Sequence, residues 1–245
     1  MKKESEMIYG MHAIIEAIDA GKEIDKIIMK NDMQGRLSHD LFKAIEGRNI
    51  PIMRVPVERL DRITKKNHQG VIAFTIPVAY QHIEDIIPTL YEDGKAPFII
   101  VLDGITDVRN FGAIARTCEC AGVHAIVIPE KNSASINADA IKTSAGALLK
   151  IPVCREKNLT NAIKFLKNSG LKIVATSDKA DDNYTDISYT DALAIVMGAE
   201  DIGISIENQR LCDTIVKILL LRTISSLNVS VATGIMAYEV LKQRL

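Results

Sequence analysis

The most chemically suggestive part of the sequence is a polar segment that follows an apolar run at residues 98–102. Asn110, Gly112 and Arg116 stand in this segment, and Arg116 interrupts the apolar start of a predicted helix. An arginine in such a setting needs an acceptor or a groove, because arginine is rarely buried without a partner. The segment therefore provides either part of a ligand site or a helix cap with a structural salt bridge.

Two later segments offer further polar groups. Residues 198–203 read Gly-Ala-Glu-Asp-Ile-Gly, where the glycines allow close backbone approach to a ligand and Glu200 could bind a ribose or orient a cation. Residues 226–230 read Ser-Leu-Asn-Val-Ser, whose hydroxyl and amide groups could also bond a ligand. Each segment alone has a structural interpretation as well. Residues 198–203 could be an ordinary strand-to-helix turn, and Ser225 or Ser226 could simply cap the helix that follows.

The elements that must position these segments alternate between strand and helix after residue 97. Apolar, β-branched runs predict strands at 98–102, 123–128, 171–176, 193–197 and 215–220. Helices are predicted at 110–121, with Asn110 as the cap, and at 138–149, 160–168 and 227–245. Repeated β-α-β units predict a parallel sheet with helices on both faces. Ligands of such sheets bind beyond the carboxyl ends of the strands.

A smaller α/β segment precedes this sheet. It has predicted helices at 11–20, 38–46 and 57–63 and predicted strands at 24–29, 50–55 and 71–75. Prolines and a polar stretch then indicate a linker that carries a short helix. We therefore expect a domain at 1–76, a linker at 77–96 and a domain at 97–245.

Composition limits the classes of function. The net charge is −1, which argues against a protein that coats nucleic acid through phosphate neutralisation, although residues 1–80 hold 13 Lys+Arg against 11 Asp+Glu. Aromatic residues make up only 4%, which leaves little surface for stacking unpaired bases. The four cysteines lack zinc-site or disulfide spacing and are expected to be reduced, buried thiols. Neither a membrane-spanning run nor a signal peptide is evident, so we expect a cytoplasmic protein.

Taken together, the three segments resemble the motifs of one family. Asn110-x-Gly112 with Arg116, the 198–203 segment and the 226–230 segment are similar, in order and spacing, to motifs one, two and three of the SpoU-type (TrmH-like) RNA 2′-O-ribose methyltransferases. Residues 8–13 and 67–71 resemble the RNA-binding domain of that family's large-subunit ribosomal RNA enzymes. The resemblance is closest to the branch that methylates guanosine in 23S ribosomal RNA (RlmB-like).

This resemblance implies features that periodicity cannot. The implied fold is of the SPOUT type, an α/β parallel sheet with helices on both faces and a C-terminal trefoil knot, preceded by a small α/β RNA-binding domain. The implied reaction is methyl transfer from S-adenosylmethionine to a ribose 2′-hydroxyl of structured RNA, with ribosomal RNA as the expected partner and no metal. The implied assembly is a homodimer.

The resemblance also assigns roles to residues. Arg116 corresponds to the residue implicated in activating the 2′-hydroxyl, and we expect it to orient the ribose or an adjacent phosphate because guanidinium stays protonated. Its expected polar surround is Asn110, Glu200, Ser226 and Asn228. The expected cofactor-binding residues are Thr176, Gly198, Ile218, Leu220 and Leu227.

One segment departs from the family pattern. Where members usually have Ile-Pro-Met-x-Gly, residues 218–222 read Ile-Leu-Leu-Leu-Arg. Leu219 and Arg222 therefore leave open a non-catalytic RNA-binding or ribosome-assembly protein with a degenerate cofactor pocket. Methylation of transfer RNA is a further alternative. The acidic run at 178–186 is interpreted as a solvated loop and His124 as a structural residue; His12 and His68 could either contact RNA or be structural.

Overall fold

The computed structural model describes residues 7–33, 35–48, 50–76, 78–221 and 226–245. These residues form two compact units. The first comprises the chain up to Ala79 together with Ile136–Ala138, and the second comprises Tyr80–Ser135 and Asp139–Leu245. Each unit has its own sheet.

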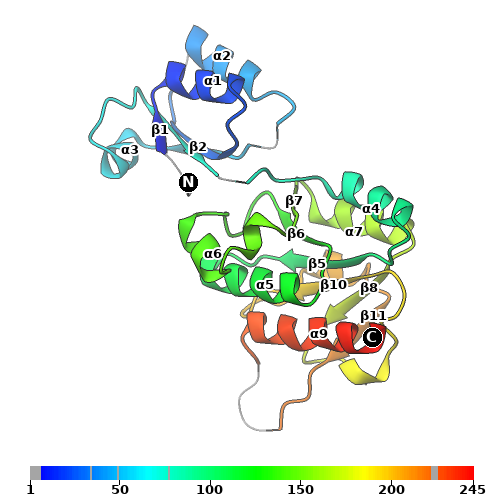
Figure 1. Cartoon of the computed structure of the whole chain (residues 1–245). Coiled ribbons are helices and arrows are strands. Elements are labelled where there is room, and N and C mark those ends of the chain that lie inside the picture. Colours follow the sequence, from blue (N-terminus) through cyan, green and yellow to red (C-terminus); the bar gives the residue numbers. More distant parts are fainter. Residues whose placement is uncertain (1–6, 34, 49, 77, 222–225) are drawn as a thin grey trace. The chain divides into compact units, whose positions relative to one another are not determined.

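The first unit, drawn mainly in blue and cyan in Figure 1, contains a four-stranded sheet, whose strand order is β1-β4-β2-β3. Helices α1 and α2 pack against one face, and the shorter α3 packs against the other. Strand β1 was not predicted, because three residues are too few to show alternation. The elements are β1 (Met7–Tyr9), α1 (Met11–Asp19), β2 (Ile24–Lys30), α2 (Arg36–Ala44), β3 (Ile52–Val55), α3 (Val57–Ile63) and β4 (Val71–Thr75).

The second unit is built on a seven-stranded sheet in the order β7-β6-β5-β10-β8-β11-β9, and every pairing is parallel. This confirms the predicted α/β fold with a parallel sheet. Its strands are β5 (Phe98–Asp103), β6 (Ala125–Pro129), β7 (Val153–Glu156), β8 (Lys172–Thr176), β9 (Asp182–Asn183), β10 (Leu193–Gly198) and β11 (Thr214–Lys217). Its helices are α4 (Ile83–Glu92), α5 (Val108–Cys120), α6 (Ala138–Thr143), α7 (Leu159–Asn168), α8 (Ile206–Gln209) and α9 (Val229–Arg244), with 3₁₀ turns η1 (Ala147–Leu149) and η2 (Tyr184–Asp186).

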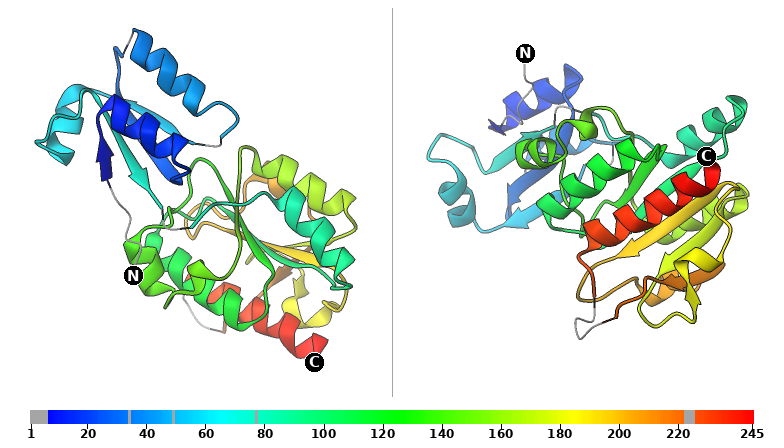
Figure 2. Two further views of the ribbon diagram at one scale, coloured as in Figure 1. Left: turned by 45° about the horizontal axis from the view of Figure 1, so that its top comes forward. Right: turned by 60° about the horizontal axis from the view of Figure 1, so that its bottom comes forward.

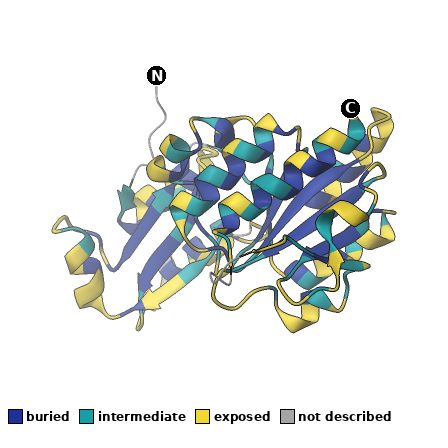
Figure 3. Ribbon diagram, turned by 90° about the horizontal axis from the view of Figure 1, so that it is seen from below, coloured by how far each residue is buried: buried dark blue, intermediate teal, exposed yellow. Residues whose placement is uncertain are grey.

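Helices cover both faces of this sheet, as Figure 2 shows. Helices α4 and α7 bury apolar side chains against one face, together with alternate residues of β5 such as Ile99 and Val101. Helices α5 and α9 pack against each other over the opposite face. The central strands are therefore buried on both sides, as Figure 3 shows, which explains why their sequences are continuous apolar runs rather than alternating ones.

Several boundaries differ from the prediction. Asn110 is not the cap of α5, because the Asp107 carboxylate accepts from the backbone N–H of Asn110 at 2.7 Å. The cap of α9 is Asn228, whereas the alternative cap Ser226 precedes it and Ser225 lies outside the described residues. The last predicted strand ends at Lys217 rather than at residue 220.

The predicted helix at 138–149 is interrupted. Helix α6 ends at Thr143, and Ala145 (φ 50°) and Gly146 (φ 87°) turn the chain before η1. Left-handed backbone breaks the helical ladder, which the helical spacing of apolar residues does not reveal. The segment predicted as a linker contains α4, whose Ile83 and Ile87 lie in the core of the second unit.

The cysteines are free, and two of them are buried. Burial raises the pKa of Cys118 well above its ordinary value, and burial followed by the charges of Glu156 and Asp85 raises the pKa of Cys154 to about 12. Cys212 is half-buried and Cys120 is exposed, so the expectation that all four are buried is wrong.

Two helical glycines offer a matched test of packing around α5. A Cβ added at Gly112 would lie 2.8 Å from the carbonyl oxygen of Ala140, whereas one added at Gly234 would meet Thr117 at an ordinary 3.5 Å. We expect Gly112→Ala to destabilise the protein by about 1–3 kcal/mol through overpacking. Gly234→Ala should be neutral or stabilising by roughly 0.5–1 kcal/mol, since alanine favours helix. Urea unfolding measures both, and equal effects would contradict this packing.

Candidate active site

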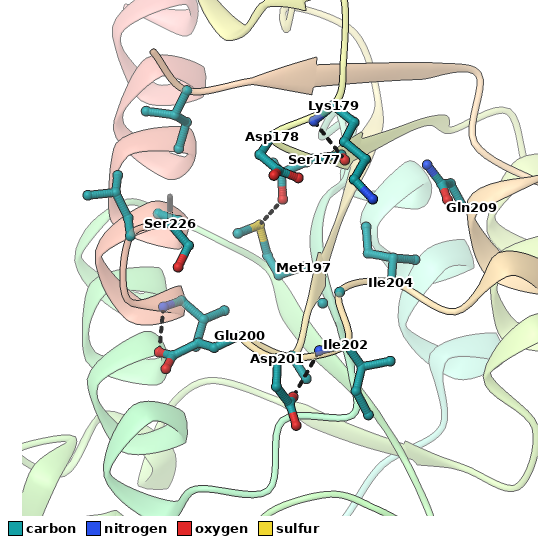
Figure 4. Close-up of a pocket in the computed structure, with 18 of the residues that line it drawn as sticks. Ser177, Asp178, Lys179, Met197, Glu200, Asp201, Ile202, Ile204, Gln209 and Ser226 are labelled. Carbon is teal, nitrogen blue, oxygen red and sulfur yellow. Dashed lines mark hydrogen bonds between the residues drawn. The ribbon is translucent and has the colours of Figure 1, made fainter. Parts of the chain in front are cut away.

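The candidate site lies where three neighbouring strands of the second unit end. Strands β5, β10 and β8 are adjacent and parallel, so their carboxyl ends meet at one edge of the sheet. A pocket of about 430 Å³ opens there, a size typical of small-molecule sites (Figure 4). It is lined by residues 176–179 and 197–204, by residues 218, 220, 226, 227, 229 and 232, and by Gln209. This is the edge at which the sequence predicted a ligand site.

A very tight loop forms one wall of the pocket. After β10 the chain turns back on itself, and the backbone N–H of Gly203 donates to the carbonyl oxygen of Ala199 at 2.8 Å. A Cβ on Gly198 would lie 2.2 Å from the carbonyl carbon of Gly203 and 2.3 Å from the nitrogen of Ile204. Only glycine fits at position 198, because real Cβ atoms do not approach backbone that closely.

The loop presents Glu200 to residues of both other motifs. Its Oε1 atom accepts from the side-chain amide of Asn228 at 2.6 Å, from the backbone N–H of Val229 at 3.0 Å and from the amide of Asn110 at 3.4 Å. The Asn228 amide also donates to the Asn110 side-chain oxygen at 3.0 Å. Three residues that are distant in sequence, one from each motif, therefore form one hydrogen-bonded cluster.

A second carboxylate fixes the other end of the same loop. The Oδ2 atom of Asp103, at the end of β5, accepts from the backbone N–H and the hydroxyl of Ser205 at 2.9 and 2.7 Å. It also accepts from the side-chain amide of Asn208 at 2.9 Å, and the Asn208 oxygen in turn accepts from the Thr160 hydroxyl at 2.8 Å. Charge-assisted bonds of this kind are stronger than neutral ones. They tie the loop and α8 to the sheet.

The structure brings most of the predicted site residues together. All five expected cofactor-binding residues line the pocket, as do two of the expected polar residues: Thr176, Gly198, Ile218, Leu220 and Leu227, with Glu200 and Ser226. Asn110 and Asn228 join them through Glu200. Of the two departures from the family pattern, Leu219 is 59% exposed and is not part of the pocket lining. Arg222 lies outside the described residues.

Arg116 is not part of this cluster. It is exposed on α5, six residues after Asn110, so its side chain leaves the helix about 120° around the axis from that of Asn110. It makes no hydrogen bond or ion pair with any residue that the structure describes. The structural salt bridge that the sequence left open is therefore absent among those residues.

Sequence reasoning missed the part of the pocket wall that follows Thr176, the last residue of β8. Ser177, Asp178 and Lys179 line the pocket, and the Ser177 hydroxyl accepts from the backbone N–H of Lys179 at 3.2 Å (Figure 4). Asp178 is exposed, as expected for the acidic run, and it also lines the pocket, which was not predicted. The pocket position of Asp178 could have been inferred from its place just after a strand, because ligands of parallel sheets bind beyond the carboxyl ends of the strands.

Two of the remaining candidates, His124 and His68, have structural contacts, whereas His12 is exposed. His124 Nδ1 accepts from the backbone N–H of Phe98 at 2.9 Å, which confirms its structural role. Burial, followed by the positive charges of Arg244 and Lys95, lowers the pKa of His124. His68 is buried and contacts Asp61 Oδ1 at 3.0 Å. Within the described part of the chain, no His, Cys, Asp and Glu residues are grouped so that they could hold a metal ion.

Comparison with known proteins identifies the family. The family model "SpoU rRNA Methylase family" matches residues 97–238, and the model "RNA 2′-O ribose methyltransferase substrate binding" matches residues 7–81. The chain belongs to the SpoU rRNA methylase family. It is accordingly an S-adenosylmethionine-dependent RNA 2′-O-ribose methyltransferase, as its motifs predicted.

Relatives match nearly the whole chain. A putative TrmH family tRNA/rRNA methyltransferase of Staphylococcus epidermidis is 33% identical over 241 residues, covering 98% of this chain and 97% of the relative. The 23S rRNA (guanosine-2′-O-)-methyltransferase RlmB of Escherichia coli K12 is 36% identical over 242 residues, covering 98% and 99%. The crystal structure of an AdoMet-bound rRNA methyltransferase from Sinorhizobium meliloti has a TM-score of 0.64 at 24% identity, covering 99% of this chain and 88% of that one, which shows a shared fold.

No helix among the described residues of this SpoU family member is both long and apolar enough to cross a membrane.

The tight loop generates a test of the cofactor site. We expect Gly198→Ala to push the 198–204 loop out of position and weaken S-adenosylmethionine binding at least about tenfold, since accommodating such a clash costs roughly 1–3 kcal/mol. Isothermal titration calorimetry measures the dissociation constant. Gly234→Ala is the control, because its added methyl group makes only ordinary contact and does not face the pocket. Unchanged affinity in a folded Gly198→Ala protein would show that the pocket does not hold the cofactor.

Proposed function

We propose that this chain methylates the ribose 2′-hydroxyl of a guanosine in 23S ribosomal RNA. The observation that carries the proposal is the near-complete match, at 36%, to the E. coli enzyme whose name specifies that reaction. The matching of both an rRNA methylase model and a substrate-binding model supports the same assignment. Methylation of transfer RNA is the second candidate, since the S. epidermidis relative is named for both RNA classes.

We propose that S-adenosylmethionine binds in the pocket, and the lining residues fit it. Gly198 lets the loop close so tightly that one pocket wall is backbone, and Ile218, Leu220 and Leu227 supply apolar contacts. The lining also carries three carboxylates, Asp178, Glu200 and Asp201, against one ammonium group, which favours a cationic ligand. The bound cofactor supplies an electrophilic methyl group, so the protein must hold the weakly nucleophilic hydroxyl in line with it.

The Asn110–Glu200–Asn228 cluster, at one side of the pocket, is proposed to hold the ribose. Because Glu200 fixes both amides through one oxygen, the cluster is rigid before substrate arrives, and preorganised groups need no rearrangement during reaction. Ser226 lies beside it in the pocket lining. We propose that Arg116 contacts the RNA backbone, because it is exposed and has no partner among the described residues.

We further propose that residues 97–245 form the catalytic domain and residues 1–76 the RNA-binding domain, connected by a 77–96 segment whose helix α4 packs into the core of the catalytic domain. A C-terminal trefoil knot is also proposed. Strand β10 lies between β5 and β8, β11 lies between β8 and β9, and α9 packs on α5, so the chain returns after β11 to a helix that precedes it by many residues. This strand order and helix packing support the knot that the resemblance to the family implies.

The proposed reaction makes a specific product. Incubation with S-adenosylmethionine and a 23S ribosomal RNA transcript should yield 2′-O-methylguanosine, measured by mass spectrometry of nuclease digests, with less product from transfer RNA. Arg116→Ala should lower transfer at least about a hundredfold while leaving the melting temperature unchanged, since it removes an exposed group used in the reaction.

Lys164→Ala is the matched control for Arg116→Ala. Lys164 is an exposed cation on α7, which covers the opposite face of the sheet, and it should be dispensable. Product found only in transfer RNA would overturn the substrate assignment. Normal turnover of Arg116→Ala would overturn the role of that arginine alone.

A homodimer is proposed from the exposed side of α9. Val231 and Tyr238 are each 51% exposed and lie seven residues apart, hence on the same side of the helix. We expect light scattering to give twice the chain mass at micromolar concentration, and Tyr238→Glu to lower that mass by placing a charge in an apolar interface. Tyr91→Glu, an exposed tyrosine on α4, is the control. A monomeric wild-type protein would contradict the proposal.

A further inference from the structure

The two faces of the N-terminal sheet are covered unequally. Helices α1 and α2 cover one face with a cluster of ten buried residues, whereas the seven-residue α3 covers part of the other face with a cluster of four (Figure 1). Leu60 of α3 packs there on Ile28, Val55 and Ile72. Residues beyond the reach of α3 on this face are only partly buried.

The strand pairing shows which side chains make up this less covered area. Met7 of β1 and Lys26 of β2 both pair with Phe74 of β4, so the three form one row across the sheet. Tyr9 lies two residues after Met7 and therefore on the same face. Lys66, from the loop before β4, completes the group. We call these five residues, Met7, Tyr9, Lys26, Lys66 and Phe74, the basic aromatic strip.

Each aromatic ring of the strip lies under a lysine. The Lys26 ammonium lies 5.5 Å from the centre of the Phe74 ring, and the Lys66 ammonium lies 5.2 Å from the centre of the Tyr9 ring. Asp25 offsets part of the Lys26 charge at 3.9 Å, whereas Lys66 makes no ion pair with any residue that the structure describes. The chain is poor in aromatic residues, at 4%, yet two of them stand here beside cations.

This combination suits RNA. Aromatic faces stack unpaired bases, and adjacent lysines neutralise the phosphates that connect them. An apolar protein partner would not need the two ammonium groups, whereas RNA complements both the charge and the flat rings. We propose that the basic aromatic strip is the surface of the N-terminal unit that binds the RNA substrate, through an unpaired base and its flanking phosphates. This inference rests on the proposed function and names the face that serves it.

The opposite face provides a matched control. There Arg54 lies over the ring of Phe42, 5.9 Å from its centre, so it carries the same type of cation–aromatic pair. Arg54 is on β3 beside Met29, which belongs to the cluster under α1 and α2. If every exposed cation and aromatic residue of this unit contributed equally to RNA binding, substitutions at Arg54 and Phe42 would weaken RNA binding as much as substitutions in the strip.

The experiment measures binding of the full chain to a 23S ribosomal RNA hairpin transcript by fluorescence anisotropy over a range of salt concentrations. We expect the double variant Lys26→Gln with Lys66→Gln to lower the slope of log Kd against log salt by about two, because two phosphate contacts are lost. Phe74→Leu, which retains apolar volume, should weaken binding roughly tenfold through lost stacking. Arg54→Gln and Phe42→Leu should change neither quantity.

Cofactor affinity separates the possible failures. All four variant proteins should bind S-adenosylmethionine as the wild type does. The two strip variants should raise KM for RNA rather than lower kcat, whereas the two control variants should change neither quantity. Strip variants that bind RNA like the control variants, in a protein that still methylates RNA, would overturn the strip. A wild-type protein that binds this RNA but transfers no methyl group would instead overturn the proposed function.

Discussion

The site depends on the absence of a side chain at position 198. At the end of β10 the chain reverses so sharply that Gly198 lies against the backbone of Gly203 and Ile204, closer than any Cβ atom could approach. This reversal makes the pocket wall from backbone and leaves Glu200 at its tip, facing the first turn of α9. There Glu200 accepts the backbone N–H of Val229, one of the donors that a helix start leaves unpaired. The negative charge is also favoured at that end of the helix dipole.

Two carboxylates hold the 198–204 loop in position, one at its tip and one at its far end. Glu200 ties its tip to Asn228 and Asn110, and Asp103 ties its far end to Ser205 and Asn208. Both ties lead back to β5 or to the helix that follows it. The loop is therefore fixed to α5 and α9 at its tip and to β5 at its far end, which explains how an exposed segment without regular structure can keep a defined pocket. The parallel sheet makes this possible because β5 and β10 end at the same edge.

Much of this arrangement could be predicted from the sequence. The buried strands are continuous apolar runs, so the parallel sheet was predictable, and the polar residues at their ends marked the edge that bears the pocket. The strand order could not be predicted, because the position of β10 between β5 and β8 depends on contacts between segments that are distant in the sequence. The break after Thr143 was missed because the spacing of apolar residues does not reveal the left-handed backbone at Ala145 and Gly146. Spacing shows which residues share a helix face or strand face but not what lies opposite them.

The segment after β11 shows how a departure from a family pattern can leave a site intact. Ile218 and Leu220 line the pocket, whereas Leu219 and Leu221 are 59% and 90% exposed. This alternation is that of an extended chain, whose successive side chains point to opposite sides. A leucine in place of the proline at 219 therefore adds bulk on the outer side and takes no volume from the pocket. The same alternation gives the pocket its apolar wall, since both inward positions carry branched aliphatic side chains. Leu219 therefore no longer supports the alternative that the cofactor pocket is degenerate. Leu219 and Leu221 instead place apolar side chains on the outer side of the segment.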